Sequence, residues 1–137
     1  MWWIYALLSA FFAALTAIFA KIGIKNVNTD LATAIRTVVI LVLAWAIAFF
    51  RGGTNTMGTL TRQNWLFLGL SGLATGLSWI FYFKALQLGK VSQVAPIDKL
   101  SVALAILFSI VFLGETLTFK TAIGALCIIA GSIIIIL

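Results

Sequence analysis

Long apolar runs separated by short polar segments make up nearly the whole chain. A helix that spans a bilayer needs about 20 largely apolar residues, and five runs reach that length. They cover about 3–22, 31–50, 65–88, 93–113 and 121–137. Their apolar residues are continuous and do not alternate with polar ones, which is not the pattern of a membrane β-barrel. The pattern therefore predicts an all-α integral membrane protein, a bundle of five transmembrane helices.

The segments between these runs are short and carry glycine or asparagine, the residues typical of turns. Consecutive helices are therefore expected to pack as antiparallel neighbours within one domain, residues 1–137. Trp2, Trp3 and Trp65 lie at run ends, as expected of aromatic anchors at the membrane interface.

Composition supports the membrane assignment and excludes several functions. Only 9% of the residues are charged and 64% are hydrophobic, whereas about a quarter of a soluble domain is charged. The net charge of +6 comes from basic residues that lie mostly between the runs, where they anchor helix ends at lipid headgroups. We therefore expect no nucleic-acid partner. With no histidine and a single cysteine, Cys127, we expect no zinc site and no histidine-based catalytic group. We also expect no other metal, no cofactor, no catalytic residue and no enzyme.

An odd number of spans puts the two termini on opposite sides of the membrane. The basic residues at and between the run ends divide almost evenly between the two sides, so the positive-inside rule barely selects an orientation. They are Lys21, Lys25, Lys84 and Lys90 on one side, and Arg51, Arg62 and Lys120 on the other. Two interpretations stay open: one orientation with the N-terminus outside, or insertion in both orientations.

Two charged residues lie inside runs that begin on the same side of the membrane. Arg36 comes about five residues after the start of the second run, and Asp98 about five residues after the start of the fourth. At about 1.5 Å per residue, both lie roughly 8 Å inside their helix ends. A charge within the bilayer is costly and usually faces a partner or a watery cavity. We therefore expect Arg36 and Asp98 to face each other, or a shared cavity near the mouth of a solute path.

A purely structural interpretation of Asp98 stays open beside that one. If the fourth helix begins at Pro96, this proline occupies its preferred first position, and Asp98 complements the helix dipole in the first turn. Adjacent residues on a helix point about 100° apart, so Lys99 is not expected to pair well with Asp98. Lys99 would instead anchor the helix at the interface or line the mouth of the path.

Hydroxyl and aromatic side chains recur at helical spacing on two of the runs. They are Ser71, Thr75, Ser78, Trp79 and Tyr82 in the third run, and Tyr5 and Ser9 in the first. We interpret both stripes as walls of a path for a small-molecule solute. The alternative is hydrogen bonding between helices, worth about 0.6 kcal/mol per bond.

Glycines recur on two runs at spacings that let helices approach closely. Gly72 and Gly76 form a GxxxG step in the third run, and Gly124 and Gly131 lie a heptad apart in the fifth. Small residues allow close backbone contact between membrane helices. We expect these four to be helix-packing positions, either within the chain or between protomers.

The C-terminal half resembles a known family. The segments "ALQLG", "FLGETLT" and "GALCIIAG" resemble the second part of an EamA domain of the drug/metabolite transporter superfamily, over about 55 residues. The first half is similar more loosely, through "FFAALTAIFAKIGI" and the five-helix layout. Val102 stands where the family often has a proline, and the segment with Pro96, Asp98 and Lys99 is usually apolar in the family.

The resemblance implies a secondary transporter that moves a small metabolite or drug-like solute by alternating access across a prokaryotic inner membrane. Usual members carry two five-helix units related as inverted repeats, whereas this chain has one. We therefore expect an antiparallel homodimer that rebuilds the ten-helix plan. The alternative function is that of a small, non-transporting membrane protein, an assembly partner or subunit of a larger complex.

Overall fold

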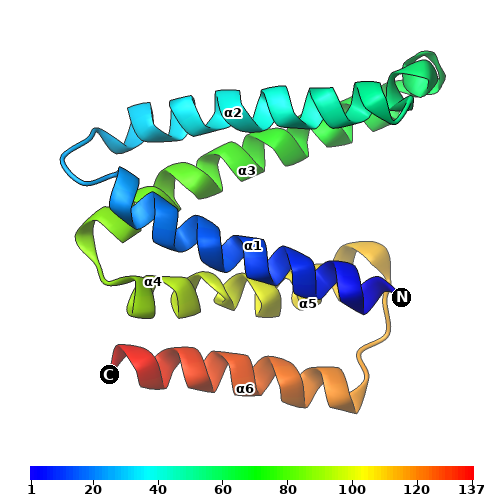
Figure 1. The fold of residues 1–137 in the computed structure, drawn as a ribbon. Helices are drawn as coiled ribbons and strands as arrows, with labels where there is room; N and C mark the ends of the chain where they lie inside the picture. The colour runs from blue at the N-terminus through cyan, green and yellow to red at the C-terminus, as the bar shows by residue number, and fades with distance from the viewer. The chain divides into compact units, whose positions relative to one another are not determined.

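The structure, a computed structural model, describes residues 1–137, and every regular element in it is helical (Figure 1). Five helical segments are long and apolar enough to cross a membrane, and α4 and α5 together form one of them. The elements are α1 (Trp2–Gly23), α2 (Thr29–Phe50), the 3₁₀-helix η1 (Gly53–Thr59), α3 (Arg62–Leu88), α4 (Val91–Asp98), α5 (Leu100–Leu113) and α6 (Phe119–Ile136). The all-α class and the five candidate spans predicted from the sequence are confirmed.

The spans bury very little of their apolar surface within the chain. In no span is more than 6% of the most apolar window buried. Large hydrophobic side chains such as Phe50, Phe81 and Ile134 are more than two-thirds exposed. A soluble protein does not leave so much contiguous apolar surface in water. These surfaces are suited to lipid hydrocarbon or to another protein within the membrane.

The helices gather into two compact units. One contains Met1–Ile18 together with Leu88–Leu137, and the other contains Phe19–Gln87. We call these the α4–α6 unit and the α2–α3 unit. That the whole chain acts as one domain stays a prediction.

In the α2–α3 unit, the turn between α1 and α2 is held by side-chain caps and by α3. Asn28 caps α2, and its Oδ1 accepts hydrogen bonds from the backbone N–H of Asp30 at 2.8 Å and of Leu31 at 3.2 Å. A capping side chain satisfies N–H groups that have no partner within the helix. From the end of α3, Gln87 Nε2 donates to the carbonyl of Val27 at 2.9 Å and, at 3.4 Å, to that of Ile24.

The small core of this unit lies beside that turn. Phe83 and Leu86 of α3 are fully buried, and Ile24 is 3% exposed. Thr29 and Thr33, one turn apart on α2, are buried too, and the Thr33 hydroxyl donates to the Thr29 carbonyl at 2.8 Å. Lys21 also reaches this end of α3 and donates to the carbonyl of Leu86. The tightest packing of the unit is therefore at the C-terminal end of α3.

In the α4–α6 unit, α6 packs against both α4 and α5 (Figure 1). The contact with α4 includes a polar bridge at Ser132, which is 4% exposed. Its hydroxyl lies 2.9 Å from the carbonyl of Pro96 and 2.8 Å from that of Ile128. A hydroxyl has one proton, so it donates to one of these oxygens at a time, and the bridge ties α6 to the end of α4.

The fourth span contains a one-residue break. The α-helical pattern stops at Asp98 and resumes at Leu100. Around the break, backbone hydrogen bonds join residues three positions apart, as in a 3₁₀-helix, and not four apart. They run from the N–H of Lys99 to the Pro96 carbonyl at 3.1 Å, and from the N–H of Val102 to the Lys99 carbonyl at 3.0 Å. Pro96 lies inside α4 and has no N–H donor for the preceding turn, and the break comes three residues after it. The alternative in which the helix begins at Pro96 is wrong, because α4 begins at Val91. Asp98 closes α4 and is not in its first turn.

The Gln87 contacts give a test of what holds the α1–α2 turn. Gln87→Leu removes the donor and leaves the Val27 carbonyl without this partner, so the free energy of unfolding should fall by about 1 kcal/mol. Reversible unfolding of the purified protein in detergent measures this change. Gln63→Leu is the matched control, because Gln63 is exposed in the first turn of α3. Equal effects of the two substitutions would contradict a specific role for Gln87.

Ser132 gives the corresponding test for the other unit. Ser132→Ala removes the bridge to the Pro96 carbonyl, and hydrogen bonds between membrane helices are worth about 0.6 kcal/mol on average. The same unfolding measurement should show a loss of about this size. Ser101→Ala, at an exposed position on α5, should change the stability less. A Ser132 variant as stable as the wild type would show that the bridge does not stabilise the packing of α4 on α6.

Candidate functional site

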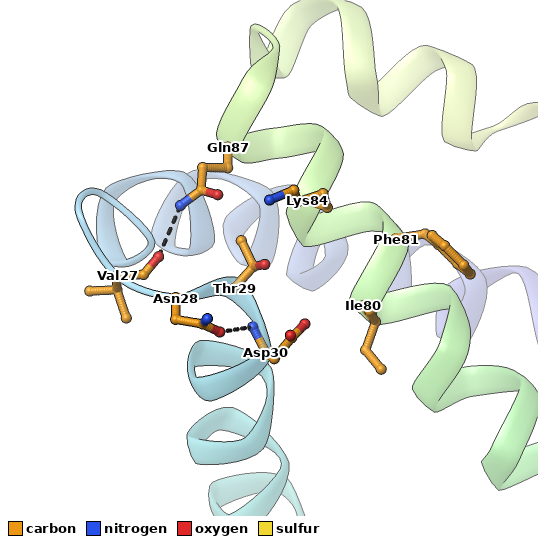
Figure 2. A pocket seen from close by; sticks show the side chains of 8 residues that line it. All are labelled: Val27, Asn28, Thr29, Asp30, Ile80, Phe81, Lys84 and Gln87. Carbon is orange, nitrogen blue, oxygen red and sulfur yellow. Dashed lines mark hydrogen bonds between the residues drawn. The ribbon is translucent and has the colours of Figure 1, made fainter.

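A polar pocket lies where the α1–α2 turn meets the end of α3 (Figure 2). It holds about 300 Å³. Figure 2 shows Lys84 and Gln87 projecting from α3 on the same side as the turn that carries Asn28 and Thr29. Its lining residues are Val27, Asn28, Thr29, Asp30, Ile80, Phe81, Lys84 and Gln87.

A second hollow of about 420 Å³ lies at the same end of the unit. Its lining residues are Lys21, Ile24, Lys25, Asn26 and Gln87. Gln87 lines both hollows, so its side chain lies between them. The two hollows together carry three lysines and one carboxylate, that of Asp30. The end of the unit is therefore positively charged.

Arg36 lies deeper along α2, seven residues beyond Thr29 and about 10 Å along the helix axis. Its guanidinium carbon is 4.5 Å from the ring centre of Trp79 and 4.8 Å from that of Phe83. Guanidinium groups stack favourably on aromatic faces, and each such contact contributes about 0.5–2 kcal/mol according to its exposure. Thr29, Thr33 and Arg36 follow one another at helical spacing on α2, so Arg36 continues the face that begins at the pocket.

Arg36 has no carboxylate partner in its unit. The only acidic residue of that unit is Asp30, near the start of α2, and no ion pair joins the two. Asp98 belongs to the other unit, and its carboxylate lies 3.5 Å from Lys99 Nζ. That Arg36 and Asp98 face each other or a shared cavity stays a prediction.

The expectation that Lys99 does not pair with Asp98 is wrong. It assumed a continuous helix, in which adjacent side chains point apart. The break in the fourth span is at Lys99, directly after Asp98, so the two residues do not belong to one regular helix. The pair is solvent-accessible, with 57% of the Lys99 side chain and 36% of the Asp98 side chain exposed. An exposed pair of this kind contributes little to stability.

The predicted path residues do not enclose a passage within either unit. On α3, Ser71, Thr75 and Ser78 are exposed, and Trp79 and Tyr82 are half-buried. The Thr75 hydroxyl donates to the Ser71 carbonyl at 2.9 Å, within the helix. Tyr5 and Ser9 on α1 are exposed as well. Trp79 contacts Arg36, a proposed path residue on a different helix. The path itself stays a prediction.

The four glycines expected at helix contacts face open space in their own units. A Cβ atom added at Gly72, Gly76, Gly124 or Gly131 would meet no heavy atom of the unit within 4 Å. Gly131 lines a shallow groove of about 430 Å³ between α4 and α6, together with Pro96, Lys99 and Cys127. Contact of these glycines with another protomer stays a prediction.

The stripe at residues 71–82 draws attention to one face of α3, but the Arg36 contacts use a neighbouring face. Trp79, Phe83 and Gln87 follow at intervals of four residues, which places them along one side of the helix. Phe83 and Gln87 were not among the expected site residues. The spacing from Trp79 is the sequence signal that could have found them.

Comparison with known proteins agrees with the resemblance in the sequence. The model of the EamA-like transporter family matches residues 1–137. A protein from Sinorhizobium sp, described as an uncharacterized transporter in the cobO 3' region, is 49% identical over 134 residues. That match covers 98% of this chain and 95% of the relative.

A human protein, solute carrier family 35 member G1, is 38% identical over 74 residues. This match covers 54% of the chain and 20% of the human protein. No solved structure matches. The five apolar helical segments and the full-length family match lead to one conclusion. The chain is a multi-pass membrane protein and belongs to the EamA-like transporter family.

Proposed function

We propose that the protein is a secondary transporter that moves a small metabolite or drug-like solute by alternating access. The observation that carries this proposal is Arg36, a charged residue about 10 Å inside a membrane span, which contacts aromatic rings and no carboxylate of its unit. Ionisable residues within membrane segments are costly, and they commonly mark solute or ion pathways. The Sinorhizobium relative, which its name describes as a transporter, supports a bacterial inner membrane as the location.

The proposed path runs from the polar pocket at the end of the α2–α3 unit past Arg36 and along the hydroxyl stripe. Residues at the mouth would receive the solute, and residues deeper in the membrane would contact it during transfer. The proposed path residues are Tyr5, Ser9, Arg36, Ser71, Thr75, Ser78, Trp79, Tyr82, Asp98 and Lys99. Lys84 and Gln87 join them because they line the pocket at the mouth.

The working form in this proposal is an antiparallel homodimer. Inverted repeats with a site near the membrane midplane are a recurring transporter plan, and one five-helix chain supplies half of it. The exposed hydroxyls of Ser71 and Thr75, and the open space at Gly72 and Gly76, are consistent with a face that a second protomer covers. Such a contact would turn an exposed stripe into the wall of an enclosed path.

Transport is tested with the purified chain in liposomes. A ¹³C-labelled extract of bacterial metabolites is added outside, with and without an imposed proton gradient, and the solutes that enter are identified by mass spectrometry. We expect at least one labelled solute to accumulate beyond the level in protein-free liposomes. The combined substitution of Ser71, Thr75 and Ser78 by alanine should slow its entry, whereas Ser101→Ala should not. If no solute enters under either condition, the transporter proposal fails.

Cross-linking tests the antiparallel dimer. Trp2→Cys and Leu137→Cys are made separately in a Cys127→Ala background, because Cys127 is exposed and would react. Differently tagged forms of the two variants are then co-expressed. Five spans put positions 2 and 137 of one protomer on opposite sides of the membrane, so an antiparallel pair brings position 2 of one protomer to the same side as position 137 of the other. We expect links between 2 and 137. Links between two copies of position 2, without 2–137 links, would exclude this arrangement.

A further inference from the structure

The Arg36 guanidinium lies against two aromatic rings of α3. Trp79 and Phe83 lie one turn apart on α3, and both rings approach the guanidinium within 5 Å, at 4.5 and 4.8 Å. A ring face attracts the guanidinium as a cation, but it supplies no carboxylate or carbonyl acceptor for the five N–H donors. No carboxylate of the α2–α3 unit forms an ion pair with Arg36. The ring contacts therefore hold the group and do not neutralise its charge.

The charge around Arg36 favours an anionic ligand. The α2–α3 unit contains six basic residues and one acidic residue. Three of the basic residues, Lys21, Lys25 and Lys84, line the two hollows at the end of the unit. A cleft lined mainly by one sign of charge raises the local concentration of ligands of the opposite sign. Arg36 lies about 10 Å further along α2 than Thr29, which lines one of these hollows.

We propose that Arg36 binds an anionic group, a carboxylate or a phosphate, with Trp79 and Phe83 as positioning residues that hold the guanidinium plane. This inference rests on the proposed transport function where the anion is part of the solute. A planar guanidinium forms two parallel hydrogen bonds with a carboxylate or phosphate, a geometry that an ammonium group does not match. The anion would also supply the counter-charge that Arg36 lacks in its unit.

Selective protein chemistry tests the binding directly. The chain has three arginines, Arg36, Arg51 and Arg62, and phenylglyoxal modifies guanidinium groups. The modification rate of each arginine is measured by mass spectrometry, with inorganic phosphate, acetate or benzoate added in a concentration series. We expect phosphate or a carboxylate to slow modification of Arg36 selectively, by about tenfold at ten times the dissociation constant. Arg51 and Arg62, near η1 at the far end of α2 and α3, serve as internal controls.

Two tryptophan variants test the role of the aromatic rings. Trp79→Leu removes one ring contact of Arg36, so protection by the anion should weaken. Trp45→Leu is the matched control, because Trp45 is exposed on α2.

In Arg36→Lys, the charge stays but the planar guanidinium is lost, and stabilisation of the protein by phosphate against thermal unfolding should decrease. This second readout does not depend on the reagent.

The anion can come from a solute or from a lipid headgroup, and two kinds of vesicle separate these sources. If the solute supplies it, Arg36 reacts in vesicles of phosphatidylcholine and of mixed phosphatidylcholine and phosphatidylglycerol, and only added anion protects it. If a headgroup supplies it, phosphatidylglycerol alone protects Arg36. Both results support an anion site, and they assign it to different ligands.

The proposal is overturned if no anion protects Arg36, if all three arginines are protected equally, or if Arg36 does not react at all. Transport is scored separately in the liposome assay. Entry of only neutral or cationic solutes, with normal rates for Arg36→Gln, would overturn the assignment of Arg36 to solute binding and leave the transporter proposal standing. Selective protection of Arg36 without entry of any solute would support the anion site and overturn the transporter proposal.

Discussion

Hydrocarbon offers no hydrogen-bond partner, and this constraint governs the whole structure. Every backbone N–H and carbonyl within the membrane must find its partner inside the protein, so the spans are helical. Because the apolar side chains already have a favourable environment in lipid, the chain needs no large core. Few side chains are fully buried, and Phe83 and Leu86 are the largest of them.

Because so little apolar surface is buried, a few polar contacts help to join the helices. Gln87 ties the end of α3 to the α1–α2 turn, and Ser132 ties α6 to the end of α4 at Pro96. Both involve carbonyls at places where regular helix bonding is interrupted. The same interruptions produce the polar pocket of Figure 2 and the break beside Asp98. The features that depart from regular helix are thus the ones that expose polar groups.

Arg36 shows how a costly group is accommodated in this setting. Its guanidinium contacts the rings of Trp79 and Phe83, which recovers part of the energy lost when a charge leaves water. The aromatic rings do not neutralise the charge. A guanidinium held in this way is pre-organised for an anion, since little side-chain freedom remains to be lost on binding.

The sequence by itself determined the class, the five spans and the family, because span length and continuous apolarity depend on the bilayer and not on packing. It also marked Arg36 and Trp79 as candidate path residues, since charge and aromatic character within a span are visible without coordinates. It did not predict the break at Lys99, or the contact of Ser132, distant in the chain, with the carbonyl of Pro96 three residues before that break. Nor did it predict the ring contacts of Arg36 or the hydrogen bond from Gln87 to the Val27 carbonyl. In a chain rich in apolar residues, many side chains fit the same helical face, and only the tertiary structure decides which of them meet.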